Sequence, residues 1–259
     1  MSVIVQSLYR YPVKGLNADS IPFADLRRGY GIPFDRTFAI ALATTPYDPS
    51  HPQWLSKQYF ATLTRHERLA AVDAHFDEEA GTLSLFRKGK QVARGNVGTP
   101  IGRAMIEEFL RAYLRNEIAG PPHLVGSAAG PMMSDSPEPL LSLVNLATIA
   151  DIERVIGRPV HPLRFRANVY VAGAPAWAEF AWLGETIALG DAQIKVTARI
   201  PRCAATNVEP GTGLRDMTIP QHLERVFGHT DCGILAAVSR TGRVAVGDVV
   251  HVPPLTDQT

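Results

Sequence analysis

The chain has 259 residues, of which 46% are hydrophobic and 20% charged, and its formal net charge is +1. This length and apolar content suffice for one large domain or two smaller ones. The small net charge does not indicate a protein that binds nucleic acid or an acidic membrane through its overall charge. Two cysteines, Cys203 and Cys232, cannot form a disulfide framework or a four-cysteine metal site, which indicates a reducing compartment such as the cytoplasm. The N-terminus has no signal-peptide pattern and no apolar run is long enough to cross a bilayer, so we expect no membrane segment.

The first half of the chain predicts mainly strands. Runs rich in β-branched and aromatic residues, bounded by turn residues, predict strands over 3–9, 21–26, 36–42, 69–76 and 82–86. Apolar residues from Ile101 to Leu114 repeat at helical spacing and predict a helix there. The segment from Gly120 to Pro139 is rich in Pro, Gly, Ser and Ala, which is typical of a linker or a long functional loop. We therefore expect two domains, over residues 1–120 and 121–259.

The second half predicts a barrel with a few helices. A short strand over 140–144 leads to Asn145, a good N-cap for a helix that ends at Gly157. A short helix is expected over 219–227. The remaining predicted strands cover residues 164–173, 185–190, 192–200, 204–208, 232–239 and 244–252. Strands this short, separated by glycine turns, favour a barrel, so the expected class is α+β and mainly β, with a β-barrel-like N-terminal part.

Most common catalytic signatures are absent. The chain has no G-x-S-x-G, no phosphate loop, no H-E-x-x-H and no C-x-x-C, and its eight histidines lack ligand spacing. Cys203 differs because Arg199 and Arg202 lie within four residues, and neighbouring cations favour the thiolate that acts as a nucleophile or metal ligand. The alternative is a small buried hydrophobe, which we prefer for Cys232.

Several cations are expected at strand ends. Arg164 and Arg166 would share a face if their segment is extended, Lys14 follows the first strand, and Arg36 opens another. Planar guanidinium groups suit phosphate and other oxyanions, and strand ends are common ligand sites. The alternative is that these arginines pair with surface carboxylates such as Asp35 and Glu179.

Four segments in order resemble the MOSC family, named for the C-terminal domain of molybdenum-cofactor sulfurase. They are YRYPVKG at 9–15, GIPFDRTFAI at 31–40, LRFRANVYVAG at 163–173 and PRCAATNVEPGTG at 201–213. The resemblance, which extends to the amidoxime-reducing components, implies a β-barrel N-terminal domain, a MOSC domain, and a molybdopterin-type molybdenum cofactor held between them.

Carried over position by position, Cys203 matches the cysteine that ligates molybdenum. The flanking Arg199 and Arg202 would keep the thiolate ionised and balance the negative cofactor, and Arg164 and Arg202 are also counted among the cofactor-binding residues. The positions that match residues contacting the cofactor's phosphate and pterin are Lys14, Arg36, Arg166 and Asn168, with Asn145 and Thr148 falling at further polar contacts.

The chain departs from the family pattern at a few positions. Gly15 stands where a serine is frequent, Ala167 where a proline is common, and Phe38 where a tryptophan is frequent. Glu209 replaces a more usual aspartate and is a candidate for proton delivery. No cysteine cluster for an iron–sulfur domain follows Cys232, so the electrons are expected to come from a separate flavin, haem or iron–sulfur protein.

Three functions remain open at this point. The first is a molybdenum enzyme that reduces N-hydroxylated or other N-oxygenated small molecules, with Cys203 as the metal ligand. The second is a sulfur carrier with a persulfide on Cys203, or a protein that handles the cofactor without redox catalysis. The third is a cofactor-binding protein that has lost catalysis.

Overall fold

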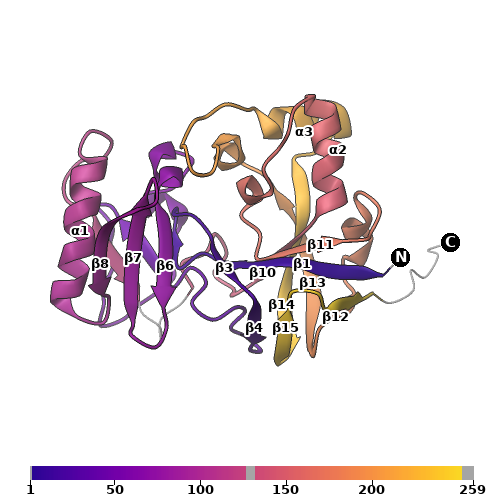
Figure 1. The fold of residues 1–259 in the computed structure, drawn as a ribbon, viewed down its shortest axis with the longest axis horizontal. Coiled ribbons are helices and arrows are strands. Elements are labelled where there is room, and N and C mark those ends of the chain that lie inside the picture. The colour runs from indigo at the N-terminus through magenta and orange to yellow at the C-terminus, as the bar shows by residue number, and fades with distance from the viewer. Residues whose placement is uncertain (1, 127–131, 253–259) are drawn as a thin grey trace.

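The computed structural model describes residues 2–126 and 132–252, and these residues are mainly β (Figure 1). The strands are β1 (Val3–Arg10), β2 (Val13–Lys14), β3 (Asp19–Ile21), β4 (Phe23–Leu26), β5 (Phe38–Ala41), β6 (Asp73–Asp77), β7 (Thr82–Arg87), β8 (Lys90–Asn96), β9 (His123–Gly126), β10 (Leu141–Asn145), β11 (Val169–Ala172), β12 (Thr186–Leu189), β13 (Ala192–Pro201), β14 (Asp231–Arg240), β15 (Gly242–Ala245) and β16 (Val249–His251). The α-helices are α1 (Pro100–Leu114), α2 (Leu146–Ile156) and α3 (Ile219–Phe227). The predicted mainly-β class is confirmed.

A closed barrel forms the larger part of the molecule. Its strand order is β11-β10-β14-β13-β12-β16-β1, and pairing of β1 with β11 closes the ring, while β3 pairs with the other half of β1. Alternate residues such as Val5, Val171 and Ile234 fill the interior, where they are fully buried. The predicted C-terminal barrel is therefore confirmed, and α2 and α3 lie together at one side of it (Figure 1).

The N-terminal part has two small sheets and one helix around a second core. The parallel pair β2–β5 continues antiparallel into β9, and β6, β7 and β8 form an antiparallel meander. Helix α1 lies beside the meander at the end of the molecule away from α2 and α3 (Figure 1). Its buried residues Ile106 and Leu110 pack against Leu83 and Leu85 of β7. The predicted helix over 101–114 is present, beginning one residue earlier.

The first strands of the chain pair with the last ones. Strand β1 completes the barrel, and β4 pairs with β15 through Ala24 and Val244. Strands β1 and β4 thus pair with strands that come after residue 120, and closing the barrel requires β1 between β16 and β11. The division at residue 120 stays a prediction as a domain boundary, but it does not follow the strand pairing.

Several local expectations were wrong. The single strand predicted over 244–252 is divided into β15 and β16, and the loop predicted over 120–139 contains β9. Residues 204–207 form a 3-10 turn and not a strand, because Thr206 donates from its backbone and side chain to the carbonyl of Cys203. Residues 67–71 are also a 3-10 turn, so β6 begins only at Asp73. The segment with Arg164 and Arg166 is not extended, since residues 162–165 are a 3-10 turn and Arg166 has φ 51°.

Within the described residues, no helix is long and apolar enough to cross a membrane.

Candidate functional site

A cationic cleft of about 380 Å³ lies between the barrel and the N-terminal part, at the end of β13. Both halves of the chain line it. Its walls carry a single carboxylate, on Asp135, against six cationic side chains, which are Lys14, Arg36, Lys57, Arg164, Arg166 and Arg202. Such an excess of positive charge in a recess favours an anionic ligand.

Cys203 lies in this cleft at the point where the chain leaves β13. Its thiol is exposed, and the backbone is still extended at φ −110° before the 3-10 turn begins. The nearest side-chain partner is the Thr64 hydroxyl of the N-terminal part, whose oxygen lies 3.8 Å from the sulfur. The structure therefore presents the thiol to solvent in the cationic cleft, which Arg202 lines and Arg199 does not.

Arg36 and Arg166 are held together by one tyrosine ring. Their guanidinium carbons lie 4.6 and 4.4 Å from the centre of the buried Tyr11 ring, and Arg36 donates to the backbone carbonyl of Arg166 at 2.9 Å. Burial raises the pKa of Tyr11 to about 12, although both arginines act against that rise. The phenol thus stays neutral and keeps its π face available to two cations.

Both arginines have unusual backbone conformations. Arg36 has φ 49° and Arg166 has φ 51°, in the left-handed region that L-residues rarely adopt. Such conformations persist where the surroundings over-determine them, and they cluster at ligand sites. Here the backbone N–H of Arg36 donates to Tyr11 at 2.7 Å and that of Arg166 to Leu163 at 3.2 Å. The fold therefore fixes the direction in which both guanidinium groups leave the chain.

Lys14 is a buried cation of the cleft. It ends β2, is only 6% exposed, and forms an ion pair with Asp135. Burial lowers the pKa of Lys14, while the Asp135 carboxylate counteracts part of that effect. Asp135 is exposed and belongs to the predicted 120–139 loop, of which residues 127–131 lie outside the described residues. The loop thus supplies part of the cleft wall.

The other predicted cleft residues are bound by protein groups. The Arg202 guanidinium donates to the carbonyls of Cys232 and Phe165 at 2.8 Å each. The Asn168 side chain accepts from the Ser142 hydroxyl at 2.9 Å. These contacts hold the ends of β10, β11 and β14 against the cleft.

Arg164 is only partly satisfied. Its terminal nitrogens lie 2.8 Å from a carboxylate oxygen of Asp216 and 3.1 Å from the carbonyl of Asn207. Its Nε is buried with no hydrogen-bond partner among the described residues. Buried donors are seldom left unpaired in folded proteins, so an orphan in the wall of this cleft is compatible with a polar group from a ligand or water.

Three predicted site residues are not brought to the cleft. Asn145 caps α2 and donates to the carbonyl of Pro175 at 2.6 Å, and the Thr148 hydroxyl donates to Glu179 at 2.9 Å. Both side chains are fully buried. Glu209 accepts from Thr212 at 2.7 Å and does not line the cleft. Their roles toward a cofactor or a proton remain predictions.

The alternative expectation was that the arginines pair with carboxylates such as Asp35 and Glu179. Within the part of the chain that the structure describes, such a pair is present for Asp35 and not for Glu179. Arg36 is paired with Asp35 and still lines the cleft. Glu179 receives hydrogen bonds from Thr148 and no arginine pairs with it among the described residues. Arg199, next to Cys203 in the sequence, lies over the Phe180 ring at 4.4 Å and does not line the cleft.

Glu179 makes the stability of the protein depend on pH. Burial raises the pKa of Glu179, and the hydrogen bonds it accepts from Thr148 and Asn145 offset only part of this. A carboxyl whose pKa is higher in the folded than in the unfolded state loses stability as the pH rises through that range. We therefore expect the Tm of Glu179→Gln, measured relative to wild type, to improve as the pH rises above about 4.5, the ordinary pKa of a glutamate. Exposed Glu185→Gln is the control, and a Tm difference for Glu179→Gln that is constant across pH would contradict the expectation.

Sequence reasoning missed several residues that line the cleft or support the residues lining it. Tyr11 lies in the segment at 9–15 that carries part of the MOSC resemblance. Its position between Arg10 and a proline does not indicate that it contacts two distant arginines. Thr64 and Lys57 come from a stretch without a strand or helix pattern, and only tertiary packing brings them to the cleft.

The residues present fit an anionic metal cofactor. An accessible thiol is a soft ligand for a metal, and arginine and lysine side chains bind phosphate. Among the described residues, no group of three or more His, Cys, Asp and Glu side chains is placed to hold a metal ion. Cys203 is the soft ligand that the cleft itself offers.

Comparison with known proteins finds one family model and several curated relatives. The model of the MOSC domain matches residues 132–251. The chain is 28% identical over 125 residues to mitochondrial amidoxime reducing component 2 of Rattus norvegicus, covering 43% of this chain and 36% of the relative. It is 25% identical over 124 residues to mitochondrial amidoxime-reducing component 1 of Homo sapiens, covering 42% and 36%. The matched region thus spans about a third of the length of these curated relatives.

Solved structures with similar shapes are more distant. The YuaD protein of Bacillus subtilis aligns over 96% of this chain and 94% of its own, with a TM-score of 0.45 and 16% identity. YiiM of Escherichia coli aligns over 45% and 56%, with a TM-score of 0.35 and 20% identity. The match to the MOSC domain thus lies in residues 132–251 of this chain, and the curated relatives are similar to it over a comparable length.

Proposed function

We propose that the protein binds a molybdenum cofactor and reduces N-hydroxylated or other N-oxygenated small molecules. The observation that carries the proposal is the exposed thiol of Cys203 in a cleft lined by six cations and one carboxylate. The relatives named as amidoxime-reducing components support the choice of substrate class.

In this proposal one cleft residue is the metal ligand, and the cationic residues bind the organic part of the cofactor. Cys203 would give its thiolate to the metal. Arg36 and Arg166, already fixed by Tyr11, would bind the cofactor's phosphate and pterin with guanidinium groups that need no reordering on binding. Lys14, at the end of β2, would add a further positive charge. Asp135, which is paired with Lys14, would have to move away or share the lysine with the cofactor.

The reaction is a two-electron reduction. An N-hydroxylated base, R–NHOH, takes up two electrons and two protons and gives R–NH₂ and water, so the N–O bond breaks and nitrogen is reduced. The cofactor supplies the redox chemistry when bound, and the two electrons come from a separate electron-transfer protein. The protein's part is to hold the substrate beside Cys203, on the side where this thiol is exposed.

A sulfur carrier is the second candidate, and one observation favours it. Cys203 is exposed, so a cysteine desulfurase could reach its thiolate and transfer a sulfur atom, forming Cys203–S–SH while the desulfurase returns to its thiol state. Incubation with a desulfurase and cysteine, followed by mass spectrometry, distinguishes the two. A persulfide on Cys203 in protein that carries no pterin supports the carrier, and near-stoichiometric molybdenum and pterin support the enzyme.

Arg166→Ala tests the cofactor site directly. Loss of a charged hydrogen-bond donor to a bound anion costs about 1.5–3 kcal/mol, which is roughly 10- to 100-fold in affinity. We expect protein purified from a host that makes the cofactor to lose most of its pterin, measured by fluorescence after oxidation.

Arg199→Ala is the matched control, because Arg199 is an arginine near Cys203 whose guanidinium packs on Phe180 outside the cleft. Its pterin content should equal that of the wild type. Equal pterin in Arg166→Ala and wild type would mean that Arg166 has only a structural role.

A further inference from the structure

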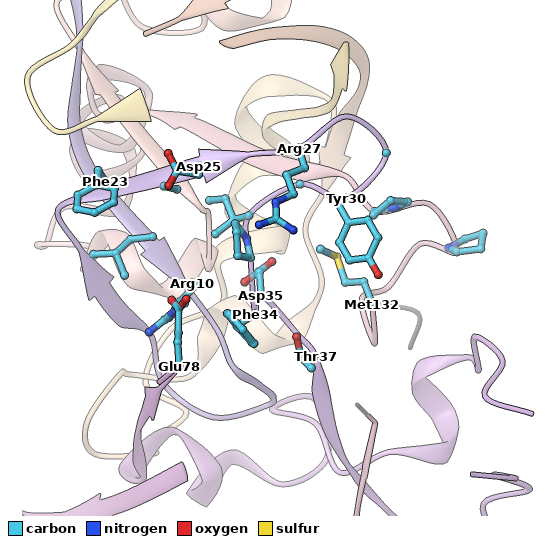
Figure 2. Close-up of a pocket in the computed structure, with 18 residues that line it drawn as sticks. Arg10, Phe23, Asp25, Arg27, Tyr30, Phe34, Asp35, Thr37, Glu78 and Met132 are labelled. Atoms are coloured by element: carbon cyan, nitrogen blue, oxygen red, sulfur yellow. The ribbon is translucent and has the colours of Figure 1, made fainter. Parts of the chain in front are cut away.

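A second, larger hollow lies on the other side of the wall that carries Arg36. This aromatic pocket has a volume of about 670 Å³ and is lined from β3, β4, the 27–35 turn and residues 132–139 (Figure 2). Asp35 lines the aromatic pocket while the next residue, Arg36, lines the cationic cleft. The two hollows are therefore neighbours that share one wall, and none of the expected roles uses the aromatic pocket.

The walls of the aromatic pocket expose unusually large apolar groups. Tyr30 is 53% exposed and Phe23 is 46% exposed, and Phe34, Ile32 and Met132 complete the lining around them. A hollow of several hundred Å³ with aromatic walls has the size and character of a small-molecule site. Aromatic side chains left in water gain by covering a flat apolar ligand.

The acidic groups of the aromatic pocket are already paired. Asp25 accepts from Arg243 at 2.8 and 3.0 Å, and Glu78 is paired with Arg10. Asp35 accepts the backbone N–H of Tyr11 at 2.7 Å and is paired with Arg36. These carboxylates are therefore compensated and do not make the pocket attractive to a cation.

Arg27 is the cation of this pocket that has no carboxylate within ion-pair distance among the described residues. Arg27 directly follows β4, and Figure 2 shows its side chain pointing into the hollow, with Tyr30 on one side and Asp35 below it. An unpaired guanidinium beside aromatic rings suits a carboxylate on an aromatic framework.

The turn that carries Arg27 is built to keep it there. Backbone N–H groups of Tyr30 and Gly31 donate to the carbonyl of Arg27 at 2.9 and 3.2 Å, and Arg27 donates back to Gly31 at 3.4 Å. Gly29 and Gly31 have φ of 74° and 72°, which allows the tight return. The charge and the Tyr30 ring thus enter the pocket from one fixed turn.

We propose that the aromatic pocket binds a small aromatic carboxylate. Arg27 pairs with the carboxylate, and Tyr30, which belongs to the same turn, contacts the ring. The site is separate from the cationic cleft and does not depend on the function proposed there.

The test uses indole-3-acetate as the probe and its neutral amide, indole-3-acetamide, as the comparison, by ligand-observed saturation-transfer NMR with titration. We expect the acid to bind at least about tenfold more tightly than the amide, since a charged pair contributes more than a neutral hydrogen bond. Arg27→Gln should remove that difference, and Tyr30→Ala should weaken both probes. Arg28→Gln is the matched control, because Arg28 neighbours Arg27 but does not line the pocket, and it should leave the titration unchanged.

Three results would overturn the proposal. One is the absence of binding of the acid to wild type. Another is an acid preference that survives Arg27→Gln. The third is binding that disappears in Arg166→Ala but not in Arg27→Gln, which would place the acid in the cationic cleft. Circular dichroism of each variant checks the fold, and all of the substituted side chains in the pocket are exposed, so folding should be retained.

Discussion

Cys203→Ala is expected to remove molybdenum from the purified protein and to abolish reduction of an amidoxime or a hydroxylamine under an artificial electron donor. The thiol is the soft donor that the cationic cleft offers to a metal, and alanine leaves none in its place. Metal content by elemental analysis and the rate of substrate reduction are the two measurements. The loss should be complete within detection, because a coordination bond is removed and not merely weakened.

The fold should survive this change. Cys203 is exposed, and among the described residues its thiol has one hydrogen-bonding contact, with Thr64 at 3.8 Å, so removal of the exposed side chain leaves no buried cavity. Pterin fluorescence is therefore informative in the same sample. Retained pterin with lost metal would show that Arg36, Arg166 and Lys14 hold the organic part independently of the sulfur.

Cys232→Ala is the matched control. Cys232 is fully buried, burial raises its pKa to about 12, and its thiol therefore stays protonated at neutral pH. Its replacement should leave the metal content unchanged and lower Tm slightly, as expected for a small buried side chain. Full metal content and activity in Cys203→Ala would contradict the assignment of Cys203 as the ligand.

Local sequence patterns predicted the elements that depend on neighbouring residues. The helix over 219–227 has the predicted bounds, and Asn145 caps α2 by accepting from Ala147 at 3.1 Å, because capping and helical spacing are set within a few residues. The strand predicted over 204–208 was wrong because a local contact competes with the strand. Its composition is compatible with a strand, but the Thr206 hydroxyl offers the backbone a local alternative that ends β13.

The site was predictable only in part, because long-range packing decides which side chains meet. Cys203, Lys14, Arg36 and Arg166 were identified by resemblance of their segments, and the structure places all four in one cleft. Thr148, by contrast, is turned toward Glu179, a residue 31 positions away whose burial no local pattern indicated. The clamp of Arg36 and Arg166 on Tyr11 joins residues more than a hundred positions apart, so spacing along the chain could not reveal it.

Gly102→Ala is expected to be the most destabilising small substitution in the N-terminal part. Gly102 lies in the first turn of α1, where the helix crosses β8 at very short range. A Cβ atom at this position would lie 2.0 Å from the carbonyl oxygen and 2.5 Å from the amide nitrogen of Asn96. These are backbone atoms of a paired strand, so they cannot rotate away as a side chain could.

The contact is reciprocal. A Cβ atom at Gly95 would lie 2.0 Å from the carbonyl oxygen of Gly102, so the two glycines face each other across the junction of β8 and α1. Alanine at Gly102 would gain up to about 1 kcal/mol in helix propensity, but it must push α1 away from the core that Ile106 and Leu110 fill. Overpacking of this kind outweighs the propensity gain, and we expect a net loss of at least about 2 kcal/mol in the free energy of unfolding.

Gly98→Ala is the control, because a Cβ atom there would meet only the side-chain oxygen of Asn96, at 3.1 Å. That amide can move by a few tenths of an ångström, so the change should stay within about 1 kcal/mol. Urea unfolding of both variants gives the comparison. Equal midpoints would mean that α1 shifts on β8 without cost. A large loss in Gly102→Ala alone would instead show that close backbone approach, and not the flexibility of glycine, requires a residue without a side chain at the start of this helix.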